Sequence, residues 1–235
     1  VGPLVAVWFL AFVWPMFMWT PDRVKSDVAI GQKISAGFAL LGKTLRELRH
    51  QGNILRFLIA RMIYADGLAT MFAFGGIYAA GTFGMELSEV ITFGIILNVT
   101  AGIGAICFAW IDDWIGSKKT IIIALTGLIG TAFGVIVVED ITWFWVWGSL
   151  LGIFVGPSQA ASRSLMARLA PGGQATEYFG LYALTGKATA FLGPFFVAVV
   201  TASMDSQRWG LSVVLVFFVV GLALLMTVRD PKTDS

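Results

Sequence analysis

Two charged side chains interrupt stretches of the sequence that are otherwise almost wholly apolar. Lys187 lies in the middle of residues 179–201, and Asp66 lies within residues 56–80. A charged side chain at the centre of a bilayer costs roughly 2.5–3.5 kcal/mol on insertion scales, so it is seldom there without a partner or a task. Both residues are therefore the first candidates for a site inside a membrane.

Asp66 and Lys187 are expected at similar depths. Each lies about ten residues from the cytosolic end of its stretch, or about 15 Å at 1.5 Å per residue, so an ion pair between them is plausible. Three interpretations remain open. The pair binds a zwitterionic solute or a coupled proton, it is a fixed bridge that sets helix packing, or it forms and breaks as the protein changes conformation.

Uncharged polar residues in the same stretches are secondary binding candidates. Each could contact a bound solute, although a side chain of this kind more often makes a helix–helix hydrogen bond worth about 0.6–2 kcal/mol. The candidates are Tyr64, Asn98, Gln159 and Tyr182, with Ser158 and Thr185 beside them.

The composition indicates a membrane protein and excludes several other classes. The 235 residues are 57% hydrophobic and 13% charged, about half the charge of a soluble domain. One cysteine, Cys107, and one histidine, His50, leave no basis for a disulfide, a zinc site or histidine catalysis. We therefore expect no enzyme, no metal and no cofactor. The basic residues follow membrane topology and do not indicate nucleic acid.

Seven apolar segments are each near the ~20 residues that cross a bilayer, which predicts an all-α, polytopic membrane protein. The segments are 2–19, 56–80, 90–111, 120–138, 142–162, 178–201 and 210–228. Of the 16 basic residues, all except Lys187 and Arg208 fall on one side if residues 20–55 are cytosolic. Within that connector, Ile34, Phe38, Leu41, Leu45 and Leu48 predict an amphipathic, basic helix, either at the membrane surface or packed against its own domain.

A short loop between the third and fourth segments carries the first resemblance. Residues 109–120 read AWIDDWIGSKKT, in which Asp113, Gly116, Lys118 and Lys119 match the cytosolic signature loop of the major facilitator superfamily. Ala109 and Trp114 depart from that pattern. A carboxylate at a helix end can bond a neighbouring helix N-terminus and pair with the basic residues, so we expect a cytosolic gate here. An ordinary polar turn is the alternative.

Three further stretches resemble the vacuole-effluxer-like family of that superfamily. They are FLIARMIYADGLATMFAFGGIYA at 57–79, GPSQAASRSLMARLAP at 156–171 and YFGLYALTGKATAFLGPF at 178–195. The resemblance implies a secondary transporter of twelve helices, with amino-acid efflux as the eukaryotic activity. It implies a bacterial inner membrane or a eukaryotic vacuolar membrane as the location, and membrane lipid and a small solute as partners.

The family pattern also predicts how the chain divides. Residues 1–19 resemble the sixth helix of such a transporter, 20–55 its central cytosolic connector, 56–228 its C-terminal six-helix bundle and 229–235 a cytosolic tail. Because the sequence begins at Val1 within an apolar run, we expect it to be the later part of a longer protein whose N-terminal half is missing here. The alternatives are a transporter of another small solute (sugar, peptide or drug) and a non-transporting half that acts as a membrane scaffold.

Overall fold

The computed structural model describes residues 2–20, 42, 46–49 and 51–230, and regular structure in these residues is helical. Seven helical spans are long and apolar enough to cross a membrane: α1 (Gly2–Trp19), α3 (Gly52–Phe83), α4 (Leu87–Ile115), α5 (Ser117–Val137), α6 (Ile141–Leu169), the pair α7 (Ala175–Ala188) and α8 (Leu192–Met204), and α9 (Gln207–Met226). The prediction of an all-α, polytopic membrane protein is confirmed. The amphipathic helix expected in 20–55 falls almost wholly outside the described residues, as does most of the 229–235 tail.

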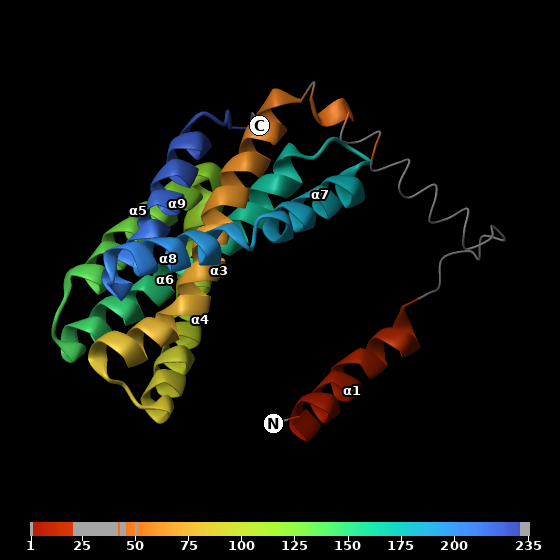
Figure 1. Cartoon of the computed structure of the whole chain (residues 1–235). Coiled ribbons are helices and arrows are strands. Elements are labelled where there is room, and N and C mark those ends of the chain that lie inside the picture. The colour runs from red at the N-terminus through yellow and green to blue at the C-terminus, as the bar shows by residue number, and fades with distance from the viewer. Residues whose placement is uncertain (1, 21–41, 43–45, 50, 231–235) are drawn as a thin grey trace. The chain divides into compact units, whose positions relative to one another are not determined.

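The chain divides into two units, residues 1–42 and 43–235. In the first, α1 is an apolar helix with no buried residue. In the second, helices α3 to α9 form one bundle (Figure 1), with α3 packed on α9, α4 on α6, and α5 between α6 and α9. Its core is formed by aromatic and aliphatic side chains such as Phe57, Phe144, Leu165 and Phe218.

Local signals in the sequence explain where the helices of the bundle begin and end. Gly84 ends α3 in the left-handed conformation (φ 68°), and its N–H bonds to carbonyls in the last turn of the helix. Glu86 and Glu89 form a capping box at the start of α4, with Glu86 N donating to Glu89 Oε2 at 2.9 Å. Asp140 caps α6 by accepting from the backbone N–H of Thr142 at 2.7 Å.

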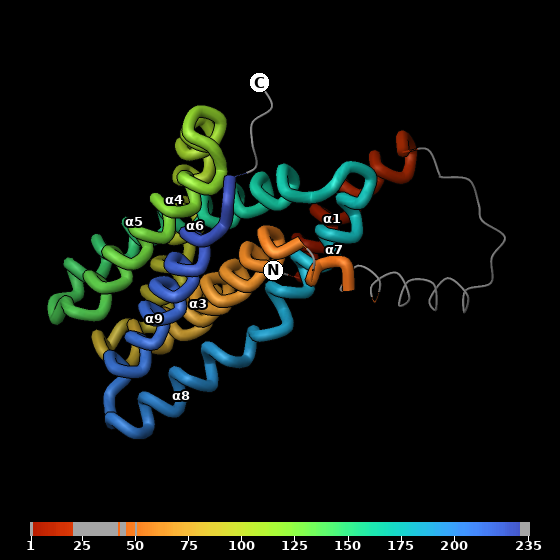
Figure 2. Tube along the Cα trace, turned by 90° about the horizontal axis from the view of Figure 1, so that it is seen from above, coloured from red at the N-terminus to blue at the C-terminus, as the bar shows by residue number. Residues whose placement is uncertain are grey.

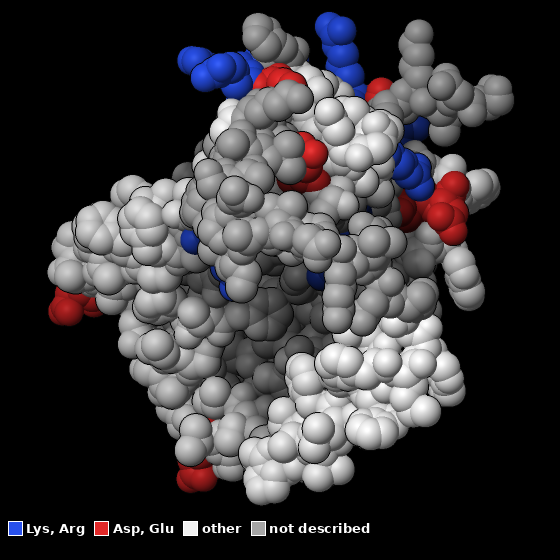
Figure 3. Space-filling model, turned by 90° about the vertical axis from the view of Figure 1, so that its right-hand side faces the viewer, with Lys and Arg blue, Asp and Glu red and all other residues white. Residues whose placement is uncertain are grey.

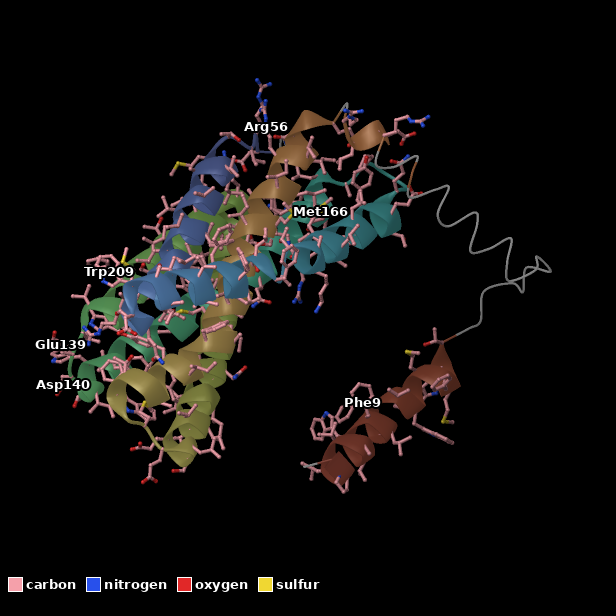
Figure 4. All side chains as sticks on the ribbon, in the orientation of Figure 1. Phe9, Arg56, Glu139, Asp140, Met166 and Trp209 are labelled. Atoms are coloured by element: carbon pink, nitrogen blue, oxygen red, sulfur yellow. The ribbon has the colours of Figure 1, made fainter. Side chains whose placement is uncertain are left out.

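Basic side chains gather near one end of the bundle, whereas acidic side chains lie at both ends. Arg56 points away from the start of α3 at one end, whereas Glu139 and Asp140 lie at the other (Figure 4). Figure 3 shows most of the exposed Lys and Arg gathered near one end. Glu139 also pairs with Arg208 across the acidic end, at 3.9 Å. This arrangement agrees with the orientation expected from the positive-inside rule.

The sixth predicted span is two helices rather than one. Helix α7 ends at Ala188 and α8 begins at Leu192, which leaves a break beside Lys187 (Figures 1 and 2). Pro194 explains the break, because its ring has no N–H and clashes with the carbonyl of the residue four positions earlier, Ala190. Proline is tolerated in the first turn of α8, where its N–H would have no helical partner. Broken helices inside membrane bundles often border binding sites.

Candidate functional site

An open pocket between α3, α6 and α7 brings together three of the predicted site residues. Tyr64 comes from α3, Gln159 from α6 and Tyr182 from α7, and all three line it. Ser162, Gly186 and Arg61 are further lining residues. Gln159 is exposed, so its amide is available to a solute, whereas Tyr64 and Tyr182 are buried.

Arg61 is the charged residue among those that line this pocket, and it is not among the site candidates predicted from the sequence. From the sequence, Arg61 is one of the basic residues that follow membrane topology, near the cytosolic end of its span. Its guanidinium instead turns onto α7, where Nη1 donates to the carbonyl of Tyr182 at 2.8 Å and to Oγ1 of Thr185 at 3.1 Å. The group also lies 3.6 Å from the centre of the Tyr182 ring, a cation–π contact. The sequence carries one signal for such a role, because Arg61 lies five residues inside the predicted apolar segment 56–80.

Arg61 is held in place but not neutralised. Its two hydrogen bonds both use Nη1, and within the described chain no carboxylate forms an ion pair with it. Both terminal nitrogens face Gly186, where an added Cβ would lie 2.9 Å from Nη1 and 3.1 Å from Nη2. A glycine at this position therefore leaves space for the guanidinium. The remaining N–H groups of the fork can donate to an anionic group, for which arginine geometry is well suited.

Tyr64 contributes structure more than binding capacity. Its hydroxyl lies 2.6 Å from Oγ of Ser162, and the Ser162 hydroxyl donates to the carbonyl of Ser158. A serine hydroxyl has one hydrogen, so Tyr64 must be the donor to Ser162. Its phenolic proton therefore bonds α6, and the pair fixes the spacing of α3 and α6 at the wall of the pocket.

Asp66 and Lys187 do not form the predicted ion pair. Asp66 is 3% exposed and accepts, through Oδ2, from the backbone N–H of Gly193 in the first turn of α8 at 3.1 Å. Lys187 is exposed on the last turn of α7. The break between α7 and α8 accounts for the difference, because Asp66 meets a freed backbone N–H there in place of the ammonium group.

Asn98 lies outside the Arg61 pocket. It lines a neighbouring apolar pocket between α3, α4 and α6, and its exposed amide donates to the carbonyl of Gly94 one turn earlier at 2.8 Å. Phe72 borders both pockets and separates them along α3. The structure thus places Asn98 near, but not among, the residues around Arg61.

The predicted gate loop is a tight corner between two helices. Gly116 alone separates α4 from α5 and has φ 89°, a conformation that favours glycine. Lys118 donates to the carbonyl of Met226 at 3.4 Å and so meets the C-terminal end of α9, where a positive charge is favourable. Asp113 and Lys119 are exposed. The buried carboxylate of this corner is Asp112, which the sequence pattern did not single out.

The helical spans, the polar pocket inside the bundle and the glycine corner together define a polytopic membrane protein of the major facilitator type. The family model described as "Vacuole effluxer Atg22 like" matches residues 3–234. The chain belongs to this family. Within the described residues, no group of three or more His, Cys, Asp and Glu could hold a metal ion.

Three curated relatives indicate the breadth of the family. The chain is 25% identical to the "Uncharacterized MFS-type transporter YxiO" of Bacillus subtilis over 98% of its length and 54% of that protein's. It is 26% identical to "Autophagy-related protein 22" of Coccidioides immitis over 99% of its length and 43% of the relative's. It is 24% identical to the protein of the same name in Candida glabrata, over 98% of its own length and 49% of the relative's. The chain therefore spans about half the length of the curated relatives it matches.

Proposed function

We propose that this chain forms the C-terminal half of a secondary active transporter that exports amino acids by alternating access. The family of vacuole effluxers and a relative described as a transporter of this superfamily support the class of activity. The lengths of the relatives support a second bundle of similar size as the missing N-terminal half. The solute would then bind between two bundles, and this chain would supply one wall.

The observation that carries the proposal is the unneutralised Arg61 within the bundle. Helix α3 has 32 residues and is about 48 Å long at 1.5 Å per residue. Arg61 lies about 10 Å along the axis from the middle of α3, within the ~15 Å half-thickness of the hydrocarbon if the helix is centred. A cation at that depth needs partners, and Arg61 has a backbone carbonyl, a hydroxyl and an aromatic ring but no carboxylate among the described residues. An anionic ligand would therefore be a favourable further partner.

An amino acid supplies the partner that Arg61 lacks. Its carboxylate would bond the free edge of the guanidinium fork, which the ring of Tyr182 keeps in place. The exposed amide of Gln159 would offer a second polar contact from α6. Lys187, one residue after Gly186 in the pocket wall, is a further cation within the same region of α7.

The gate function of the α4–α5 corner is a separate part of the proposal. Lys118 holds this corner to α9. Asp113 and Lys119 are exposed on it, and their side chains make no hydrogen bond or ion pair among the described residues, so they are available to contact a second bundle. Such contacts would form in one conformation and break in the other.

Exchange of labelled solute in proteoliposomes tests the proposal, with the protein at its natural length. Labelled amino acid should enter vesicles preloaded with unlabelled amino acid, and sugars and uncharged drugs should not compete. The Arg61→Gln variant should lose this exchange, because a bidentate partner of the carboxylate is removed. The matched control is Arg56→Gln, an exposed arginine on the same helix, which should exchange at the parental rate.

Two results would contradict the proposal. Exchange of a sugar or a drug in place of amino acids would assign a different solute. A well-folded parental protein that exchanges no solute from any of these classes would favour the scaffold alternative.

A further inference from the structure

The α7–α8 break places a buried carboxyl group against a helix N-terminus. Asp66 lies on α3, and its Oδ2 accepts the N–H of Gly193, the second residue of α8. The side chain is 3% exposed. It does not line the Arg61 pocket, although its neighbour Ala65 does. Asp66 therefore occupies a closed position behind the pocket, between the pocket wall and α8.

The second oxygen of Asp66 has no partner. Oδ1 is buried and makes no hydrogen bond within the described residues, and the same holds for Oγ1 of Thr70, one turn further along α3. Both atoms face Gly193, because a Cβ added there would lie 3.3 Å from Asp66 Oδ1 and would collide with the Thr70 hydroxyl. Two unpartnered polar groups thus converge on the first turn of α8.

The charges around Asp66 do not neutralise it. Helix α8 carries no titratable side chain, and α9 carries only Arg208, at its opposite end. On α3 the nearest titratable groups are Arg61 and Tyr64, which bond to α7 and α6. The other elements packed on α3 also carry titratable groups, which are Glu177, Tyr178, Tyr182 and Lys187 on α7, Arg163 and Arg168 on α6, and Glu89, Cys107, Asp112 and Asp113 on α4.

An ionised carboxylate in this position would be buried with one N–H donor and no cation, which is a costly arrangement. A carboxylic acid is less costly in this position, because Oδ2 still accepts from Gly193 and no charge is taken out of water. A small shift of either side chain would let a proton on Oδ1 bond the Thr70 hydroxyl, which faces the same glycine. The proton comes from water and returns to it, and only the O–H bond forms and breaks. Movement of α8 away from α3 would expose the group to water and permit ionisation.

We propose that Asp66 is the proton-coupling group of this protein, protonated while α8 is closed against it and ionised when α8 moves away. The proposal rests on the proposed transport function. It assigns solute binding to the Arg61 pocket and proton binding to the far side of α3. Asp66 and Gly193 would thereby link the proton to the position of the broken helix.

Two transport modes separate this role from solute binding. The Asp66→Asn variant keeps the size and neutrality of the protonated acid, so in proteoliposomes it should retain exchange of labelled solute at equal pH. It should lose solute accumulation driven by a pH gradient. The control is Glu139→Gln, which alters a carboxylate at the exposed acidic end of the bundle and should retain both activities. Retained pH-driven accumulation in Asp66→Asn would overturn the proposal, and so would lost exchange in a folded variant.

Infrared difference spectroscopy tests the proton directly and needs no transport. The parental protein should show a protonated carboxyl band that is absent in Asp66→Asn and shifted in Thr70→Val, which removes the facing hydroxyl. If the parental protein exchanges no solute, the transport proposal fails while the infrared band still decides whether Asp66 holds a proton. A spectrum without such a band, or with a band unchanged by both substitutions, would overturn the inference.

Discussion

Helices α4 and α6 approach closely enough at one point that a single methyl group should separate them. The backbone of Gly104 on α4 lies against the carbonyl of Ile153 on α6. That carbonyl has no helical partner, because Pro157 four residues later has no N–H. Glycine is the residue that permits such contact between membrane helices. We therefore expect Gly104→Ala to destabilise the protein.

The magnitude can be worked from the distances. A Cβ added at Gly104 would lie 2.7 Å from the carbonyl carbon and 2.9 Å from Cα of Ile153, and closer still to the oxygen. Carbon atoms in ordinary contact are about 3.5–4.0 Å apart, so the helices must separate by about 1 Å. The obstacle is backbone and cannot rotate away. Overpacking of this kind typically costs about 1–3 kcal/mol.

The matched control lies two residues away on the same helix. Gly102 is exposed, and nothing lies within 4 Å of a Cβ added there. In Gly102→Ala the better helix propensity of alanine, worth up to about 1 kcal/mol, acts without a clash. Thermal unfolding of both variants in the same detergent should show a lower Tm for Gly104→Ala and an unchanged or higher Tm for Gly102→Ala. Equal Tm values for the two variants would refute the α4–α6 contact.

Three further predictions concern other contacts. Tyr64→Phe should lower the Tm, because a buried hydrogen bond to Ser162 worth about 1 kcal/mol is lost. Tyr78→Phe should not lower it, because the Tyr78 hydroxyl is buried without a partner in the described chain. An equal loss of Tm in both variants would contradict the assignment. Gly116→Ala should lower the free energy of unfolding by about 1–2 kcal/mol, because φ 89° is strained for a residue with Cβ. An unchanged midpoint of denaturant-induced unfolding would contradict the conformation assigned to Gly116. Hydrogen bonds from the Thr142 side chain and the first-turn N–H groups lower the pKa of Asp140, so its stabilising effect is present above its ordinary pKa and is lost as pH falls through the lower folded value. The Tm difference between the parental protein and Asp140→Ala should accordingly shrink at acid pH, and a difference that grows there would reverse the sign of the linkage.

The sequence predicted the spans well, because a long apolar run has few alternatives to a membrane helix. The seven expected segments correspond to the seven apolar helical spans. Their ends were less predictable: α3 runs from Gly52 to Phe83, well beyond the expected 56–80, because polar residues at a helix end are not excluded from the helix itself. The division into four parts remains a prediction, since most of the connector lies outside the described residues.

The site was harder to predict, because side-chain partners depend on backbone breaks that hydropathy does not report. Depth along the sequence suggested that Asp66 would meet Lys187, yet Pro194 breaks the helix and gives Asp66 a backbone N–H in place of an ammonium group. Arg61 was read as a topology signal because its direction cannot be inferred from spacing. Asp112 and Asp113 are adjacent, and only the structure shows which of them is buried.

The most direct test of the central claim is solute-dependent thermal stabilisation of the natural-length protein. A zwitterionic amino acid and the amine that lacks only its carboxylate would be compared, each with the parental protein and with Arg61→Gln. The account predicts that the amino acid raises the Tm of the parental protein, that the amine does not, and that Arg61→Gln abolishes the difference. Equal stabilisation by the amine, or an undiminished response in Arg61→Gln, would contradict the assignment of Arg61 as the carboxylate-binding residue.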